Sequence, residues 1–453
     1  MEATRLLGKS KLWIGASPPR SLAIGFALII AVGMVLLKLP VSVRSGHELS
    51  WLDAAFTAAS ATCVTGLTVV DTGVVFSSFG DGVILALVQV GGLGFMTIGT
   101  LFAFFLRRKV SLKERLLLQE ALNQGNLEGI VRLVRKVILY ALTIEAAGSL
   151  LYALRFMTQM SFGKALGYGV FHSVSVFNNA GFDLFGEYRS MAAYVSDPFV
   201  NTVSILLILL GGLGFVVLAD LVDYPIRRRL SLHSKIALST TLLLSFGGAA
   251  VILIYEYTNE NTFGALGTVD QIFAALLHSV SPRSAGISTL DVSSFRQATQ
   301  FLLIWLMFIG ASPGSTGGGI KTTTFAVLVF AVLAVVRGKT DVVIFRSRIE
   351  RERVYKAITV TLLSLSLILL VTMILSITEN HMFMGVLFEV TSAFTTSGLS
   401  MGLTPDLSPV GKMLIMGMMY FGRVGPLTLF YAVGPKPGRR QLYRYAEGKI
   451  IIG

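Results

Sequence analysis

Charged residues are scarce in this sequence, and their scarcity excludes most soluble folds. They make up 14% of the 453 residues, whereas 53% of the residues are hydrophobic and the mean hydropathy is +0.73. Soluble domains carry about 25% charged residues. We therefore expect an all-α polytopic membrane protein whose surroundings are a lipid bilayer.

Cysteine, paired histidines and catalytic motifs are also missing. The single cysteine, Cys63, excludes an intrachain disulfide and argues against a cysteine-rich metal site. His172 and His278 have no further metal ligand at a suitable spacing. No combination of nucleophile, base and oxyanion hole can be recognised, so we predict no catalytic residues and no enzymatic activity.

Nucleotide-binding motifs are absent in the same way. No dinucleotide fingerprint occurs. The run 314 to 319 resembles a phosphate loop, but Lys321 comes one residue late and no strand precedes the run. We expect that this chain alone binds no nucleotide.

Basic residues are plentiful, with a formal net charge of +13, but their positions argue against nucleic-acid binding. Positive charge gathers in the cytoplasmic loops of membrane proteins. Here 28 of the 38 basic residues lie in alternate segments, at 1 to 20, 107 to 136, 227 to 235, 337 to 356 and 436 to 453. This pattern predicts that those segments and both termini are cytoplasmic.

Eight apolar stretches are long enough to cross the ~30 Å hydrocarbon core at ~1.5 Å per residue. We place them at 22 to 40, 82 to 106, 133 to 154, 198 to 220, 236 to 255, 299 to 335, 354 to 377 and 410 to 434. Four apolar segments on the side opposite the basic loops are too short to span, and their length is typical of re-entrant helices. These segments are 51 to 62, 164 to 177, 268 to 280 and 382 to 395.

Each short segment ends in a glycine-bearing loop. The loop glycines are spaced 115, 105 and 112 residues apart, at Gly66, Gly181, Gly286 and Gly398. This spacing predicts a unit of helix, pore loop and helix that is repeated four times in tandem. We expect the four units to be arranged as a pseudo-fourfold pore like that of a potassium channel. We assign the repeats to 22–106, 107–220, 221–335 and 336–434, between cytoplasmic segments 1–21 and 435–453.

A second motif recurs in the helix after the loop. The sequence GGLGF occurs at 91 to 95 and again at 211 to 215. The equivalent positions in the other two units are Gly310 and Gly422, where the sequences have diverged. Close packing of helices through small residues is an equally good explanation of these glycines.

The four loops together predict a cation filter. Inward-pointing carbonyls can replace the hydration shell of a cation, glycine adopts the left-handed backbone that such carbonyls require, and short helices direct their partially negative C-terminal ends towards the axis. Only the first loop resembles the Thr-Val-Gly run of potassium channels, so we expect few well-defined ion sites. The predicted filter residues, whose carbonyls would bind potassium, are Cys63, Val64, Thr65, Gly66, Asn179, Ala180, Gly181, Ser284, Ala285, Gly286, Thr396, Ser397 and Gly398.

The stretch 299 to 335 is too long for one straight span, because its 37 residues would extend about 55 Å as a helix. Five glycines and a proline within ten residues are incompatible with a regular helix. We predict a mobile loop that obstructs the pore beneath the filter, and a permanent kink is the alternative. The predicted gate residues are Gly310, Ala311, Ser312, Pro313, Gly314, Ser315, Thr316, Gly317, Gly318, Gly319, Lys321 and Arg423.

Arg423 lies near the middle of its span, where a charge costs at least ~2.5 to 3.5 kcal/mol. Near the axis it would repel a cation by about 4 kcal/mol at ~4 Å and an effective dielectric of ~20. We predict an electrostatic barrier, with an ion pair to Glu145 or Glu389 as the alternative. Other polar residues are expected to brace the loops by hydrogen bonds rather than to contact the ion, namely Asn178, Asn179, Asp183, His278, Arg283 and Glu389.

These features together resemble the bacterial Trk/Ktr/HKT superfamily of potassium transporters, and most of all its KtrB type of membrane subunit. The resemblance rests on the four loop glycines, the glycine-rich interruption of the third unit and Arg423, and it covers nearly the whole chain. Ser284 and Ile287 depart from the Thr and Phe that the family often has, which affects fine selectivity rather than the class.

The resemblance implies channel-like potassium uptake across the bacterial inner membrane by a homodimer with one pore per subunit. It also implies sodium as a possible activating ion and regulation by a cytosolic nucleotide-binding RCK ring of the KtrA type. The segments 107 to 136 and 337 to 356 and the tail after 434 would be docking surfaces, unless their charge only sets the topology. The competing function is an obligatory sodium- or proton-coupled symporter. Such carriers typically have inverted repeats and two broken helices, whereas we expect parallel repeats and one broken helix.

Overall fold

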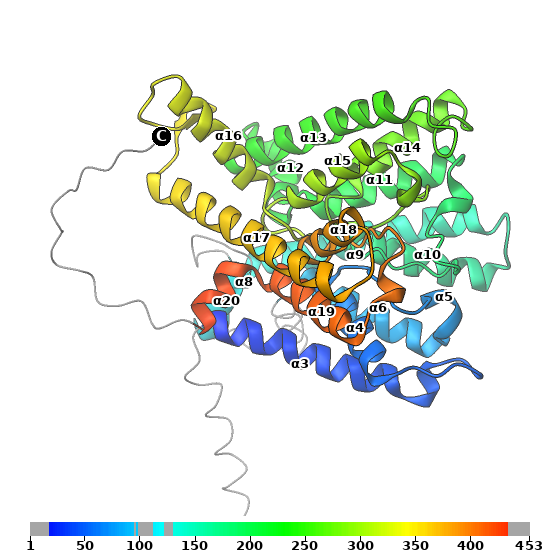
Figure 1. Ribbon diagram of the computed structural model, residues 1–453. Helices are drawn as coiled ribbons and strands as arrows, with labels where there is room; N and C mark the ends of the chain where they lie inside the picture. Colours follow the sequence, from blue (N-terminus) through cyan, green and yellow to red (C-terminus); the bar gives the residue numbers. More distant parts are fainter. Residues whose placement is uncertain (1–17, 95–96, 98–111, 122–129, 434–453) are drawn as a thin grey trace, which may run out of the picture.

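The computed structural model describes residues 18–94, 97, 112–121 and 130–433. Apart from 18 to 21, the predicted end segments 1–21 and 435–453 lie outside these residues. Helices make up most of the described chain (Figure 1), and its only sheet is the hairpin of β1 (Val343–Ile344) and β2 (Ser347–Arg348). The prediction of an all-α polytopic membrane protein is confirmed.

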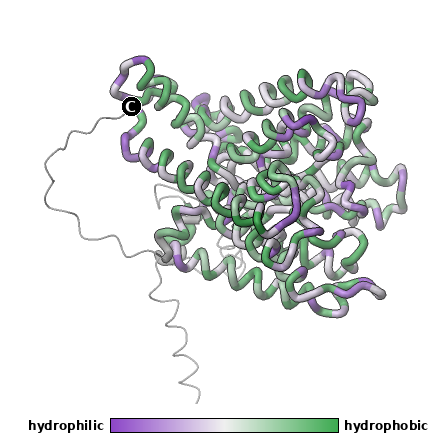
Figure 2. Tube along the Cα trace, in the orientation of Figure 1, coloured by the Kyte–Doolittle hydropathy of each residue, from purple (hydrophilic) through white to green (hydrophobic). Residues whose placement is uncertain are grey.

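The first helix of each unit is long and apolar, with 21 to 28 residues. These first helices are α3 (Pro18–Lys38), α9 (Ile130–Phe156), α13 (Leu232–Glu256) and α17 (Arg351–Thr378). Large apolar side chains such as Leu139, Leu243 and Ile377 are exposed on them. Figure 2 shows apolar residues along the helices and hydrophilic residues concentrated in the connecting loops. Each first helix can therefore cross a bilayer with one face towards lipid.

The predicted re-entrant segments form the four short helices, each within two residues of its expected bounds. They are α4 (Trp51–Cys63), α10 (Phe162–Phe177), α14 (Thr268–Val280) and α18 (Phe383–Thr395). Each short helix packs against the first helix of its own unit. Because they have only 13 to 16 residues, about 20 to 24 Å of helix, they are too short to cross the ~30 Å hydrocarbon core.

The second helices are interrupted in more than one unit, so the prediction of a single broken helix is wrong. They comprise α6 (Ser78–Leu93), α11 (Pro198–Gly212) with α12 (Phe215–Arg227), α15 (Gln297–Phe308) with α16 (Thr322–Val336), and α19 (Pro409–Val424) with α20 (Pro426–Val433). The bend between α11 and α12 is 101°. The predicted continuous spans at 198 to 220 and 410 to 434 are therefore interrupted, and most of 95 to 106 lies outside the described residues.

Glycine explains where these helices stop. Gly94, Gly214 and Gly425 have φ values of 82°, 91° and 90°, which a residue with a Cβ rarely adopts. Pro426 follows the third of them at the first position of α20, where its missing N–H is not needed. The interruptions are thus encoded by single residues that hydrophobicity alone does not reveal.

Contacts between neighbouring units close the four repeats into a ring. The second helix of each unit packs against the short helix of the next: α6 against α10, α11 against α14, α15 against α18, and α19 against α4. The last contact joins the fourth unit to the first. The repeats are therefore parallel and related by a pseudo-fourfold axis, as the sequence predicted.

Short elements complete the connections between these helices. They are η2 (Pro40–Ser42), α5 (Thr72–Val75), α8 (Leu112–Ala121), η3 (Ala192–Tyr194), η4 (Val292–Ser294) and η5 (Thr404–Asp406).

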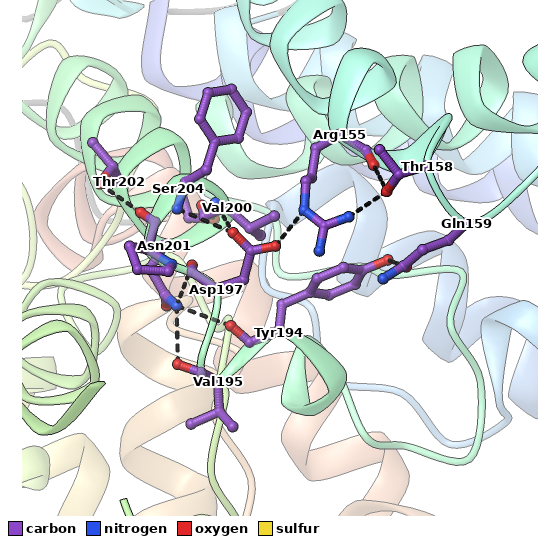
Figure 3. A network of polar contacts seen from close by, with 12 residues as sticks. Arg155, Thr158, Gln159, Tyr194, Val195, Asp197, Val200, Asn201, Thr202 and Ser204 are labelled. Atoms are coloured by element: carbon purple, nitrogen blue, oxygen red, sulfur yellow. Dashed lines mark hydrogen bonds and ion pairs between the residues drawn. The ribbon is translucent and has the colours of Figure 1, made fainter. Parts of the chain in front are cut away.

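A polar network joins the end of α9 to the start of α11 (Figure 3). Arg155 Nε lies 2.6 Å from Asp197 Oδ2, and Asp197 Oδ1 accepts hydrogen bonds from the backbone N–H groups of Phe199 and Val200. Asp197 therefore caps the second helix and holds it to the first. In the third and fourth units, Glu256 and Glu379 make the same kind of connection to the starts of α15 and α19.

Asp197→Ala should lower the thermal stability of the protein in detergent, because it removes a helix cap worth ~0.5 to 2 kcal/mol together with the ion pair. The control is Glu187→Ala, which breaks an ion pair with Arg189. Both side chains of that pair are exposed, Glu187 by 68% and Arg189 by 73%. Exposed pairs contribute ~0 to 1 kcal/mol. Equal shifts of the midpoint temperature for the two variants would contradict the capping role.

Candidate functional site

Each short helix ends in the same unusual backbone turn. The residue two positions before each loop glycine has a positive φ: 59° at Val64, 59° at Asn179, 87° at Ser284 and 50° at Thr396. The glycines themselves follow with φ of 92°, 72°, 70° and 87°. Positive φ is an outlier for β-branched residues, so the surrounding structure must hold it. The sequence pointed to one left-handed residue per loop, whereas the structure has two.

The four loop glycines approach one another closely, and we call them the glycine ring. A Cβ added to any one of them would meet the carbonyl oxygen of the residue that precedes the next glycine. The separations would be 2.3 Å from Gly66 to Ala180, 3.1 Å from Gly181 to Ala285, 2.5 Å from Gly286 to Ser397 and 2.0 Å from Gly398 to Thr65. The contacts run through all four units and return to the first. The structure thus brings the predicted filter residues together around one axis, with Cys63 buried at the end of α4.

A serine in the last turn of each short helix, or just after it, holds the loop. Ser60 Oγ accepts from the N–H of Gly66 at 3.1 Å, and Ser392 Oγ accepts from Gly398 at 3.0 Å. In the other units the hydroxyl donates to the carbonyl after the glycine, from Ser175 to Phe182 at 2.7 Å and from Ser281 to Ile287 at 2.5 Å. These serines were not among the predicted site residues. Their signal is a serine five or six residues before every loop glycine.

Polar side chains behind the loops make the hydrogen bonds that were predicted for them. Asn178 Nδ2 donates to Gln89 Oε1 and to Glu145 Oε1, both at 2.9 Å. The remaining contacts are Asp183 with the N–H of Phe185, His278 with Ser288, Arg283 with Ser245, and Glu389 with Ser400 and Thr404. These groups support the loops from outside the ring.

Glycines of the second helices allow direct contact with the short helices. A Cβ would lie 2.1 Å from Thr62 O at Gly91, 1.9 Å from Phe177 O at Gly211, and 1.8 Å from Phe394 O at Gly422. Packing through small residues therefore explains the repeated motif. Gly310 differs, because its Cβ would meet Gly318 O at 2.2 Å.

Between α15 and α16 the chain forms a non-helical segment, residues 309 to 321, which we call the intramembrane loop. It is tied to the bend of the second unit: Ser312 N donates to Gly212 O at 2.9 Å, and Phe215 N donates to Gly314 O at 2.9 Å. The predicted interruption of the third unit is confirmed. Its conformation depends on the bend between α11 and α12, which sequence analysis did not foresee.

Arg423 connects the fourth unit to this loop and to the first unit. Its guanidinium donates to the carbonyl oxygens of Thr316, Gly91 and Gly92, the last at 3.1 Å. Glu145 and Glu389 have the other partners given above, so the alternative of an ion pair with either acid is wrong. Lys321 Nζ donates to Gly317 O at 2.6 Å. Both cations are thus held by backbone carbonyls of the interrupted segments.

A cavity of 820 Å³ is lined by residues of the intramembrane loop but by none of the four glycines of the ring. Arg423, Lys321, Arg353 and Lys356 are among the residues that line it. In the part of the chain that the structure describes, no group of three or more His, Cys, Asp or Glu residues could hold a metal ion.

Comparisons with known proteins agree with this architecture. A family of cation transport proteins, TrkH, matches residues 8–435. The Ktr system potassium uptake protein B of Bacillus subtilis is 44% identical over 441 residues, covering 97% of this chain and 98% of the relative. The potassium/sodium uptake protein NtpJ of Enterococcus hirae is 39% identical over 442 residues, covering 96% and 97%. The crystal structure of the potassium transporter TrkH from Vibrio parahaemolyticus has the same fold, with a TM-score of 0.71 at 18% identity over 91% of this chain and 85% of that one.

Gly422→Ala should strongly reduce the yield of folded protein, because its Cβ would lie 1.8 Å from a backbone oxygen that cannot move aside. Gly417→Ala is the matched control on the same helix, since a Cβ there has no neighbour within 4 Å. We expect the control to be neutral or to gain ~0.5 to 1 kcal/mol. Size-exclusion profiles in detergent report the difference, and similar profiles for both variants would refute the packing role.

Proposed function

Because the chain belongs to the TrkH family of cation transport proteins, we propose that it is the ion-translocating membrane subunit of a potassium uptake system. The names of the relatives specify potassium, or potassium and sodium, as the transported ion. The observation that carries the proposal is the glycine ring, in which four loops with matching left-handed backbones meet around one axis.

The ring would act as the selectivity filter. The carbonyl oxygens of Thr65, Ala180, Ala285 and Ser397 lie beside the ring glycines and would replace water around potassium. The four short helices end at the loops, so their C-terminal dipoles add a field that favours a cation. Sodium would serve as a possible activating ion. The non-identical loops imply modest discrimination.

The intramembrane loop and Arg423 would form the gate. The loop contacts the second unit through Gly212 and Phe215, and Arg423 links it to the first unit, so it is held beneath the ring from several sides. The guanidinium charge opposes a cation that approaches this level. The loop would be mobile rather than a permanent kink, and potassium would pass only after the loop leaves its present contacts.

Partners follow from the same proposal. The relative in Bacillus subtilis is named as one protein of a Ktr system, which supports a separate partner subunit. We infer a homodimer regulated by a cytosolic nucleotide-binding RCK ring of the KtrA type, in a bacterial inner membrane with both termini cytoplasmic. The hairpin β1–β2 and the start of α17 extend from the body (Figure 1) and carry basic residues such as Arg348 and Arg353, so they are candidate docking surfaces.

An obligatory sodium- or proton-coupled symporter remains the alternative. The number of broken helices does not separate the two functions, since several second helices are interrupted. The parallel repeats and the closed ring favour a pore, because symporters commonly use inverted repeats. Unitary currents in a planar bilayer distinguish them, as a strictly coupled carrier gives no single-channel steps.

Purified protein in liposomes should give a saturable potassium flux in which rubidium and caesium compete. The expected result is faster flux in potassium than in sodium, and stimulation when a regulatory ring is added with its nucleotide. Isotope uptake across a potassium and sodium series measures both effects. A flux that does not change when potassium, rubidium or caesium is added would contradict the assignment of the ring as a filter.

Arg423→Gln should raise potassium flux by at least about tenfold, because removing only a third of a ~4 kcal/mol barrier already has that effect. Arg423→Lys keeps the charge but cannot reach three carbonyls at once, so it separates repulsion from loop anchoring. Arg189→Gln, at an exposed residue of the outer connection, is the control. Unchanged flux in Arg423→Gln would exclude the gate role.

A further inference from the structure

Two residues next to the glycine ring reach the intramembrane loop with their side chains. Asn179 Nδ2 donates to Thr316 Oγ1 at 3.0 Å, and Ser284 Oγ accepts from the backbone N–H of Gly318 at 2.9 Å. Asn179 and Ser284 are the left-handed residues of the second and third loops. All four residues are buried, so bulk water does not compete for these bonds.

Ser284 also bonds within the filter region. Its hydroxyl donates to the carbonyl oxygen of Thr396 at 2.8 Å, in the left-handed turn of the fourth loop. A serine hydroxyl has one hydrogen, so the direction of the chain is fixed from Gly318 N–H through Ser284 to Thr396. Consecutive hydrogen bonds of this kind strengthen one another in a buried site. A movement of Gly318 therefore affects, through Ser284, the carbonyl group of Thr396, which lies two residues before the ring glycine Gly398.

The loop backbone lies directly against these residues. A Cβ on Gly317 would be 2.9 Å from Ser284 Oγ, and one on Gly318 would be 2.4 Å from Thr396 Oγ1. Only glycine fits at both positions. The intramembrane loop does not make such a contact with every loop of the ring. In the first loop the residue equivalent to Asn179 and Ser284 is Val64, whose side chain has no polar atom.

From these contacts we propose that Ser284 and Asn179 are positioning residues that couple the intramembrane loop to the glycine ring, so that loop position sets the discrimination between potassium and sodium. The inference rests on the proposed function of the ring as a filter and deepens it. When the loop withdraws, Ser284 loses the donor Gly318 and Asn179 loses the acceptor Thr316. The left-handed turns then lose part of what holds them, and the ring changes shape.

The test is a double-mutant cycle read out as the permeability ratio of potassium to sodium, from reversal potentials in liposomes or planar bilayers. Ser284→Ala is made in the intact chain and in a chain whose loop is shortened by deletion within 311 to 318. In the intact chain we expect the ratio to change about threefold or more, the effect of one lost hydrogen bond. In the shortened chain the ratio should already be altered, and Ser284→Ala should change it less than in the intact chain, because only the bond to Thr396 is left to lose.

An equal change in both backgrounds would overturn the inference, since Ser284 would then shape the ring without reference to the loop. Failure of the proposed gate gives a different result: shortening the loop would leave the flux unchanged, whatever happens to the ratio. Should the shortened chain not fold, the cycle of Thr316→Val with Asn179→Ala replaces it. Additive changes of the ratio in that cycle would equally overturn the coupling.

Two further variants separate coupling from general damage. Ser284→Thr keeps the hydroxyl, and Thr396 shows that threonine can occupy this left-handed position, so it should restore the ratio that Ser284→Ala loses. Ser376→Ala removes a hydroxyl that donates to Thr372 O within its own helix. It should change neither flux nor ratio, and a shift like that of Ser284→Ala would contradict a specific role for Ser284.

Discussion

The structure depends on one constraint, the close approach of four backbone segments at the centre of the molecule. Each loop glycine lies against a carbonyl oxygen of the next loop, at distances that leave no room for a Cβ at Gly66, Gly286 and Gly398 and little room at Gly181. Because the contacts form a closed cycle, no unit can shift without displacing its neighbours. The serines at the ends of the short helices and the left-handed residues before the glycines serve this arrangement, since they direct each chain into the ring.

The second helices are subject to the same constraint of close backbone packing. They pack on the ends of the short helices through Gly91, Gly211 and Gly422, again without room for a side chain. Three residues later, less than one turn further on, the chain is interrupted at Gly94, Gly214 and Gly425, which have positive φ. These interruptions expose carbonyls and N–H groups that must find partners inside a membrane protein. Arg423 donates to the carbonyl oxygens of Gly91 and Gly92. The intramembrane loop donates to the carbonyl oxygen of Gly212.

Arg423 therefore combines a structural role with the electrostatic role that we propose for it. Its charge lies among neutral carbonyls rather than beside a carboxylate, so the electrostatic repulsion of a cation is not cancelled by a neighbouring acid at the contacts described. Its hydrogen bonds also hold the loop to the first unit. The loop in turn touches the ring through Asn179 and Ser284, so the regions proposed as filter and gate form one hydrogen-bonded structure.

The sequence by itself determined the membrane class, the four repeats, the short helices and the break before Lys321, because these follow from local hydrophobicity, length and glycine spacing. It also located the residues that meet at the ring. Only the tertiary structure decided that Val64 and its equivalents are left-handed, that α11 bends at Gly214, and that Arg423 binds carbonyls instead of Glu145 or Glu389. Those features arise from contacts between units about 100 residues or more apart in the sequence, which local patterns do not encode.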